Sequence, residues 1–307
     1  MGALDALLHP VFSYEFMRLA LIAAVVVGVS SSVLSSLLVV RHQALLGDAI
    51  SHAVLLGVVA GYLVFGTTGI LPGALLVAIA TGLVITYIHR NSVVKLDAIM
   101  GVCFTGTFAL GLAILSVTQP RGLDLFHILF GNVLGVSWAD LALTAISGGL
   151  VVLVVVVFFR SFHLWSFDPL MAQAAGVRTG VLQYVFTALL SATIVASLQA
   201  VGLILVTAML ITPGATAQLV TKRLSRMMLV ASLVGLFSAV AGLYVSFYLD
   251  VASGPAIVIL ATAIFVFVFL LAPGSGLLGR RRRRSASRAA RRRAVEKPGP
   301  SALGAGH

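Results

Sequence analysis

An acidic and an imidazole side chain stand four residues apart within one of the most apolar stretches of the chain, GDAISHAVLLGVVAGY (residues 47–62). If this stretch is a helix, Asp48 and His52 lie on one face, because residues i and i+4 are neighbours on a helix surface. Carboxylate oxygen with imidazole nitrogen is a ligand set for manganese, iron or zinc. Magnesium and calcium favour oxygen alone, and copper(I) favours sulfur. The pair is therefore a candidate metal site.

Two structural roles for the pair are open alternatives. Asp48 follows Gly47 near the start of its apolar run and could cap the N-terminus of a helix. His52 could simply hydrogen-bond back to Asp48. An ionisable pair inside a membrane helix is by default a hypothesis of function. Two side chains do not fill a coordination sphere, however, so a second copy of the chain would have to supply a matching pair.

The chain as a whole is too apolar to be a soluble protein. Of its 307 residues 60% are hydrophobic and only 9% are charged, with a mean hydropathy of +1.12. A soluble domain carries about a quarter charged residues, whereas a membrane-spanning helix needs about 20 predominantly apolar residues. The composition predicts an all-α polytopic membrane protein. Its single cysteine, Cys103, cannot form a disulfide within the chain.

Nine apolar runs are long enough to cross a bilayer. They lie near residues 18–40, 44–66, 70–89, 97–117, 137–159, 181–198, 201–219, 227–248 and 255–272. The two runs that meet at Gln199 could instead form one bent element, so we expect about eight or nine spans. This divides the chain into a short N-terminal segment (1–17), a transmembrane domain (18–273) and a polybasic tail (274–307) that is expected to be disordered and cytoplasmic.

The basic residues predict the orientation of these spans. With the tail in the cytoplasm, eight basic residues of the connections fall on the cytoplasmic side: Arg41, Arg90, Lys95, Arg160, Arg178, Lys222, Arg223 and Arg226. Only Arg18 and Arg121 fall on the other side. Because cytoplasmic loops carry an excess of Lys and Arg, we expect a cytoplasmic C-terminus and, with nine spans, an external N-terminus.

The tail holds ten of the 20 Lys and Arg residues. A polybasic stretch that directly follows a membrane span fixes topology and lies on anionic lipid headgroups. Anionic lipids are therefore the expected partner of the tail, and nucleic acid is not.

The sequence gives no positive signal for an enzyme. An intramembrane aspartyl protease needs two carboxylates that share a proton, and Asp48 is the only acidic residue well inside a predicted span. Serines are numerous, but their spacing to His52 gives no sign of a serine protease. The phosphate-binding pattern GxxxxGK[ST] is absent from the sequence. We therefore expect no ATPase activity in this chain and no permanently bound cofactor.

The segment SFDPLMAQAAGV (residues 166–177) predicts a short helix in a basic connection. Asp168 followed by Pro169 is typical of a helix start, with Asp as the cap and Pro in the first helical position, and Gly176 is typical of a helix end. A short capped helix on the cytoplasmic face is something that a partner protein could bind. An ordinary interfacial helix is the alternative interpretation.

Pro213, followed by Gly214, interrupts the apolar run 201–219. Proline removes a backbone donor and crowds the carbonyl group four residues earlier, here that of Met209. Transporters use such breaks to expose backbone along a pathway. Proline also occurs in ordinary membrane helices, so the break alone is weak evidence for a pathway.

Five segments, in order, resemble the membrane permease subunit of ABC importers for manganese, zinc and iron, the ABC-3 type of metal permease. They are RHQALLGDAISHAVLLGVVAGY, HILFGNVLGVSW, SFDPLMAQAAGV, SLQAVGLILVTAMLITPGATA and SFYLDVASGPAIVIL. The resemblance runs from about Arg18 to Pro273 and leaves the arginine-rich tail outside. The family pattern has proline where Leu56 stands in this chain.

The resemblance implies a type II-like ABC importer permease in the bacterial inner (cytoplasmic) membrane. It implies a second permease copy, as a homodimer or a close paralogue, two separate ABC ATPase subunits and an extracytoplasmic metal-binding lipoprotein. It makes Asp48 and His52 metal ligands in the pathway, with manganese as the first expectation and zinc or iron next. The residues that it implies in coupling to the ATPase are Phe167, Asp168, Pro169, Ala172, Ala175 and Gly176. Pro213 and Gly214 would form the pathway helix break.

A stand-alone secondary transporter or channel that uses the same Asp–His site is the alternative. It would need no docking helix, and inverted repeats would be expected. Nine spans do not divide into two equal halves, so the sequence favours the ABC importer.

Overall fold

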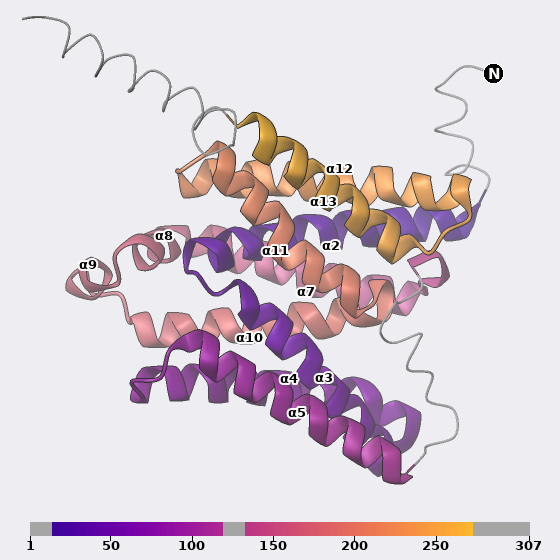
Figure 1. Ribbon diagram of the computed structural model, residues 1–307, viewed down its shortest axis with the longest axis horizontal. Helices are drawn as coiled ribbons and strands as arrows, with labels where there is room; N and C mark the ends of the chain where they lie inside the picture. Colours follow the sequence, from indigo (N-terminus) through magenta and orange to yellow (C-terminus); the bar gives the residue numbers. More distant parts are fainter. Residues whose placement is uncertain (1–13, 119–132, 273–307) are drawn as a thin grey trace, which may run out of the picture.

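Every regular element in the described part of the chain is a helix (Figure 1). The computed structural model describes residues 14–118 and 133–272. The long helices are α2 (Glu15–Val40), α3 (Ala44–Phe65), α4 (Ile70–Asn91), α5 (Leu96–Thr118), α7 (Trp138–Val157), α10 (Thr179–Val201), α11 (Leu203–Val220), α12 (Leu224–Leu249) and α13 (Ser253–Leu271). The short ones are η1 (Gly66–Gly69), η2 (Val133–Gly135), α8 (Phe159–Phe167) and α9 (Pro169–Ala174). The predicted all-α class is confirmed.

The nine predicted spans correspond to nine long helices within the described residues. Eight stretches are long and apolar enough to cross a membrane, and one of them, Ala44–Asn91, contains both α3 and α4. Gly66, with a φ of 67°, ends α3, and α4 turns back to pack along it. The chain is therefore an integral membrane protein in which α3 and α4 form a tight hairpin.

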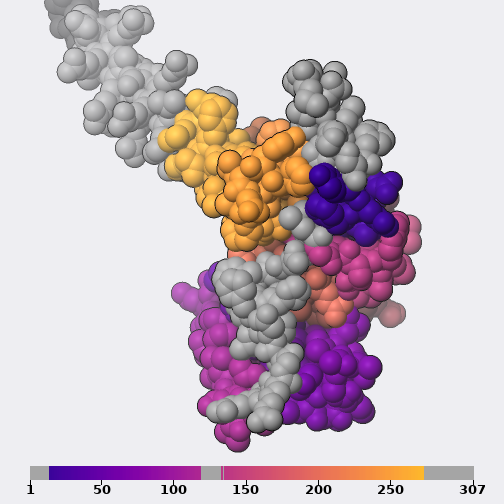
Figure 2. All heavy atoms as spheres, turned by 90° about the vertical axis from the view of Figure 1, so that its right-hand side faces the viewer, coloured from indigo at the N-terminus to yellow at the C-terminus, as the bar shows by residue number. Residues whose placement is uncertain are grey.

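The bundle has two outer groups of helices around a central one. Helices α12 and α13 pair on one side, while α3, α4 and α5 pack together on the other; α2, α7, α10 and α11 lie between them (Figure 1). Figure 2 looks onto one end of the bundle and shows the C-terminal pair in orange and yellow above residues 44–118 in purple and magenta. Helix α2 contacts α7, α11 and α12, so it is the element around which the centre is packed.

The antiparallel helices bring the predicted cytoplasmic connections to one end of the bundle (Figure 1). The turn between α2 and α3, the turn between α4 and α5, the helices α8 and α9, and the turn between α11 and α12 all lie there. Arg18 lies near the start of α2, at the opposite end. The eight basic residues of the connections thus share one end. Arg121 and the tail lie outside the described residues.

Three boundaries differ from the sequence prediction. The break between α10 and α11 falls at Gly202, whose φ of 78° suits glycine, and Gln199 lies inside α10. Helix α11 runs back along the bundle, so α10 and α11 are separate helices and not one bent element (Figure 1). Helix α2 begins at Glu15, earlier than predicted, and the run expected to end at 159 divides into α7 and α8.

Helices α2 and α11 are joined where Pro213 interrupts the backbone hydrogen bonds of α11. The backbone N–H of Gly214 donates to Ser35 Oγ (2.9 Å), and Ser35 Oγ donates to the carbonyl oxygen of Ile211 (3.2 Å). A Cβ on Gly214 would lie 2.6 Å from the backbone carbonyl atoms of Ser35, so only glycine permits this approach. Side-chain hydroxyls of neighbouring helices are a known way to satisfy backbone groups freed by proline in a membrane.

Because of this close contact, adding one methyl group at residue 214 should lower the stability of the protein strongly. Gly214→Ala would push α11 away from α2 and break the hydrogen bonds through Ser35, at a cost of about 1–3 kcal/mol, as for other overpacked sites. We expect a clearly lower melting temperature of the purified protein in detergent. Gly149→Ala in α7 is the matched control, because a Cβ there meets nothing within 4 Å. Equal melting temperatures for the two variants would contradict the close approach.

Candidate metal site

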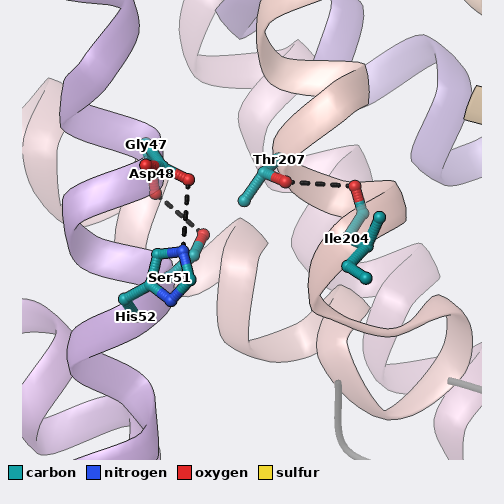
Figure 3. Close-up of polar contacts among 6 residues, drawn as sticks. All are labelled: Gly47, Asp48, Ser51, His52, Ile204 and Thr207. Carbon is teal, nitrogen blue, oxygen red and sulfur yellow. Dashed lines mark hydrogen bonds and ion pairs between the residues drawn. The ribbon is translucent and has the colours of Figure 1, made fainter. Parts of the chain in front are cut away.

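Asp48 and His52 face each other on the first half of α3 (Figure 3). Asp48 Oδ1 lies 3.5 Å from His52 Nε2. Gln43 occupies the N-cap position of α3, which begins at Ala44, so Asp48 lies in the second turn and is not an N-cap. The capping alternative is therefore wrong, while the contact between the two side chains is present.

The spacing of the two atoms suits a shared ion. An oxygen and a nitrogen that each bind a metal at about 2.1 Å in tetrahedral geometry are about 3.4 Å apart. The observed 3.5 Å is also too long for a strong hydrogen bond, whose N···O distance is about 2.9 Å. The geometry can therefore accept an ion between Oδ1 and Nε2 with little movement of either side chain.

Aromatic rings from α5 hold the imidazole in place. The His52 ring meets Phe104 and Phe108 edge to face, with centroid distances of 4.7 Å and 5.5 Å. His52 Nδ1 is buried and has no hydrogen-bond partner among the described residues. When Nε2 binds an ion, the neutral ring carries its proton on Nδ1. The phenylalanines, and not a hydrogen bond, fix the ring orientation here.

The pair is partly accessible and incomplete. The side chains of Asp48 and His52 are 39% and 25% exposed. Within the described residues, no group of three or more His, Cys, Asp or Glu side chains could enclose an ion. One chain thus offers two strong ligands that are open on one side.

Thr207 of α11 faces the pair across the gap between the helices (Figure 3). Its hydroxyl donates to the carbonyl oxygen of Ile204 (3.0 Å) and points away from the pair, so its methyl group is on the side of the pair (Figure 3). Sequence reasoning missed Thr207, Phe104 and Phe108. Nothing in the sequence marks them, because the phenylalanines reach His52, and Thr207 comes to face the pair, only through the packing of α5 and α11 beside α3.

The predicted short helix is present as α9. Asp168 Oδ1 accepts the N–H groups of Leu170 and Met171, and Pro169 occupies the first turn. Gly176 has a φ of 81° and donates to Gln173, while Val177 donates to Ala172, which closes the helix in a Schellman motif. Helix α8, which precedes it, was not predicted.

Large apolar side chains are exposed on α9 and at the end of α8. Leu170 and Met171 of α9 are 78% and 59% exposed, and Phe167, the last residue of α8, is 52% exposed. Ala172 is fully buried against the rest of the chain, whereas Ala175 and Gly176 are exposed. The small residues that the sequence singled out therefore do not share one surface, because Ala172 packs inward.

Pro213 and Gly214 are buried, and Gly214 contacts Ser35 of α2. One turn earlier, Leu210 of α11 packs against Gly47 of α3. The helix break thus lies next to the part of α11 that borders the site, and its role in a pathway stays a prediction. Leu56 does not disturb α3, which continues as a helix to Phe65.

Comparison with known proteins identifies the family. The model of the ABC 3 transport family matches residues 13–272, which include the whole described bundle. The chain belongs to the ABC 3 transport family. It is therefore a membrane component of an ABC transporter, and an ATPase motif of its own is not expected in such a subunit.

Two curated relatives and one solved structure illustrate the similarity. The chain is 45% identical over 280 residues to the manganese transport system membrane protein MntC of Halalkalibacterium halodurans, covering 91% of this chain and 95% of that protein. It is 42% identical to the chelated iron transport system membrane protein YfeD of Yersinia pestis, covering 88% and 90%. The structure of PsaBC from Streptococcus pneumoniae with a Fab matches with a TM-score of 0.78 at 35% identity, covering 89% and 97%.

The geometry of the site predicts metal binding through both side chains. Asp48→Asn and His52→Gln should each lower the Mn²⁺ affinity of the purified protein by at least tenfold, since even outer-shell partners of metal ligands contribute 10–100-fold. Isothermal titration with Mn²⁺ and Zn²⁺ measures this. Asp97→Asn, an acidic residue in the first turn of α5, is the control and should bind as the parent protein does. Unchanged binding in both site variants would show that the pair is structural.

Proposed function

We propose that this chain is the permease subunit of an ATP-driven importer for a divalent transition metal, with manganese as the first candidate. The observation that carries the proposal is the Asp48–His52 pair, a metal-ligand set at 3.5 Å on a membrane helix of an ABC 3 family protein. Charged groups within a membrane are costly and are retained where they serve a pathway. The family assignment also favours an ABC importer over a stand-alone transporter or channel.

A second permease copy completes the coordination in this proposal. One chain supplies two ligands on an open face, and an identical chain or a close paralogue would bring two more. Four oxygen and nitrogen ligands suit manganese, ferrous iron and zinc. Manganese is the first candidate because relatives are named for manganese transport. Iron is the next candidate because one relative is named for chelated iron transport.

The proposed cycle uses alternating access. A metal-binding lipoprotein delivers the ion at the outer face, and the carboxylates and imidazoles replace part of its water shell. ATPase subunits bound at the basic, cytoplasmic end then drive the change between outward and inward states. Transport results because the pair binds the ion with different strength in the two states. The two ATPases, the lipoprotein and a C-terminus in the cytoplasm of a bacterial cell are parts of this proposal.

The direct test is uptake by the assembled importer. In cells that lack their own manganese importers and express the full set of subunits, Asp48→Asn or His52→Ala should abolish ⁵⁴Mn²⁺ uptake. Membrane abundance and co-purification of the ATPase should stay at the parental level. Asp97→Asn should transport normally. Normal uptake by either site variant contradicts the proposal, and loss of the protein from the membrane would assign the pair a folding role.

Helix α9 is the proposed docking element for the ATPase. Helix α9 lies at the basic end of the bundle, where a cytoplasmic partner would bind (Figure 1). Leu170 and Met171 of α9 and Phe167 at the end of α8 expose apolar side chains there. The Asp168 cap and the Gly176 ending set how this surface is presented. Movement of the ATPase would reach the bundle through Ala172, which is packed inside.

Gly176 offers a matched pair of substitutions. Gly176→Leu forces a branched side chain into a left-handed conformation, which costs roughly 1–2 kcal/mol, and should disorder the end of α9. Asn tolerates this conformation, so Gly176→Asn is the control. We expect the Leu variant to lose metal-stimulated ATP hydrolysis and to co-purify less ATPase, while Mn²⁺ binding to the permease is unchanged. Loss of Mn²⁺ binding with normal ATPase attachment would place this segment in the pathway instead.

A further inference from the structure

A second polar pocket, of about 600 Å³, lies at the basic end of the bundle and does not include Asp48 or His52. Its walls come from the turn after α2, the junction of α8 and α9, the end of α11 and the start of α12. These elements are far apart in the sequence. The pocket is therefore a product of the fold and not of one local segment.

The lining is basic and carries no acidic residue. Arg41, His42 and Lys222 contribute to it. Within the part of the chain that the structure describes, no carboxylate forms an ion pair with any of the three. Asp168 is the nearest acidic residue in sequence to the lining residues, but its Oδ1 caps α9 by accepting two backbone N–H groups. Among the described residues, no ion pair therefore balances the positive charge of Arg41 and Lys222.

Two buried donors in this pocket have no partner among the described residues. Ser166 is 8% exposed, and its hydroxyl makes no hydrogen bond. Arg41 stacks its guanidinium 4.2 Å from the centre of the Trp165 ring and donates from Nη1 to the Trp165 carbonyl oxygen (3.1 Å), yet its buried Nε is unpaired. Burial lowers the pKa of Arg41. Both donor atoms are closed to solvent in this structure, so small rotations of the Ser166 and Arg41 side chains would bring them to an anion in the pocket. The anion would then satisfy both donors and stabilise the guanidinium charge.

We propose that this pocket binds an anionic phosphate group, carried by the headgroup of a membrane phospholipid. Phosphate oxygens accept hydrogen bonds from guanidinium, hydroxyl and ammonium groups together. Basic pockets between transmembrane helices at the cytoplasmic side are known sites for anionic headgroups.

The position and the walls of the pocket favour a lipid as the source of the phosphate. The pocket lies where α2 and α11 end, and the ends of membrane-spanning helices lie at the depth of the lipid headgroups. Val40, Phe167 and Met227 add apolar surface beside the cations. A phospholipid uses both kinds of surface, whereas a free phosphate ion uses only the polar part.

A lipid in this pocket would brace the junction of α8 and α9 against α2 and α12. Phe167 and Pro169 both line the pocket and belong to the segment proposed to dock the ATPase. The position of α9 would then depend on the presence of anionic lipid, and this consequence rests on the proposed function of α9. The binding of lipid itself does not.

The test uses the full-length chain, purified and stripped of lipid in a neutral detergent. Titration with phosphatidylglycerol should raise the melting temperature and give a bound lipid in native mass spectrometry, whereas phosphatidylcholine should not. Lys222→Gln should weaken phosphatidylglycerol binding about fivefold, the expected effect of one basic residue at a membrane surface. Ser166→Ala should weaken it as well. Lys95→Gln removes the same charge at the same end of the bundle, outside this pocket, and should leave binding unchanged.

Each outcome of this experiment decides the proposal. If inorganic phosphate binds with the same dependence on Lys222 and Ser166, the anion site stands and its ligand is the free ion. Equal stabilisation by phosphatidylcholine, or equal loss in Lys222→Gln and Lys95→Gln, would overturn it. The lipid proposal is also wrong if Lys222→Gln leaves lipid binding intact but lowers co-purification of the ATPase, because the pocket would then bind protein. None of these readouts involves metal transport, so they are independent of the proposed importer function.

Discussion

A hydrocarbon interior offers no hydrogen bonds, so each helix of this protein must satisfy its polar groups within the protein. This constraint explains the packing of the bundle. Hydroxyl groups of α2 bond to backbone carbonyls, and Ser35 reaches across to the interrupted backbone of α11. Apolar side chains gain little from leaving lipid for another helix, so close contact between backbones at small residues supplies the attraction. Gly57 and Gly73 join α3 to α4 in this way.

The same constraint makes the Asp48–His52 pair a candidate functional site, because ionisable groups inside a membrane are costly. Other polar side chains in the spans include hydroxyls that are bonded to a neighbouring helix, as Thr144 is, or within their own helix, as Thr193 is. The Asp48–His52 pair instead combines a carboxylate and an imidazole at 3.5 Å on a partly exposed face. The rings of Phe104 and Phe108 contact the imidazole on one side, and the other side of the pair is open. A site of this form can bind an ion firmly enough to remove part of its water and still release it when a neighbouring helix moves.

Much of the fold follows from the sequence because apolar length is a direct requirement of the bilayer. The runs 70–89 and 227–248 correspond to α4 and α12 within a few residues, and Asp168, Pro169 and Gly176 start and end α9 as expected. Tertiary packing is what the sequence did not reveal. Nothing in the order of residues places Phe104 and Phe108 beside His52, buries Ala172, or gathers Arg41 and Lys222 around one pocket.

The central claim is that His52 nitrogen binds the transported ion, and electron spin-echo spectroscopy of Mn²⁺ tests it directly. Mn²⁺ bound to the purified permease should show the modulation of a coordinated imidazole ¹⁴N nucleus. The account predicts that His52→Gln removes this modulation, while His89→Gln, at the far end of α4, retains it. Mn²⁺ that shows the same nitrogen coupling in the absence of His52 would contradict the account, because the ion would then be held somewhere else.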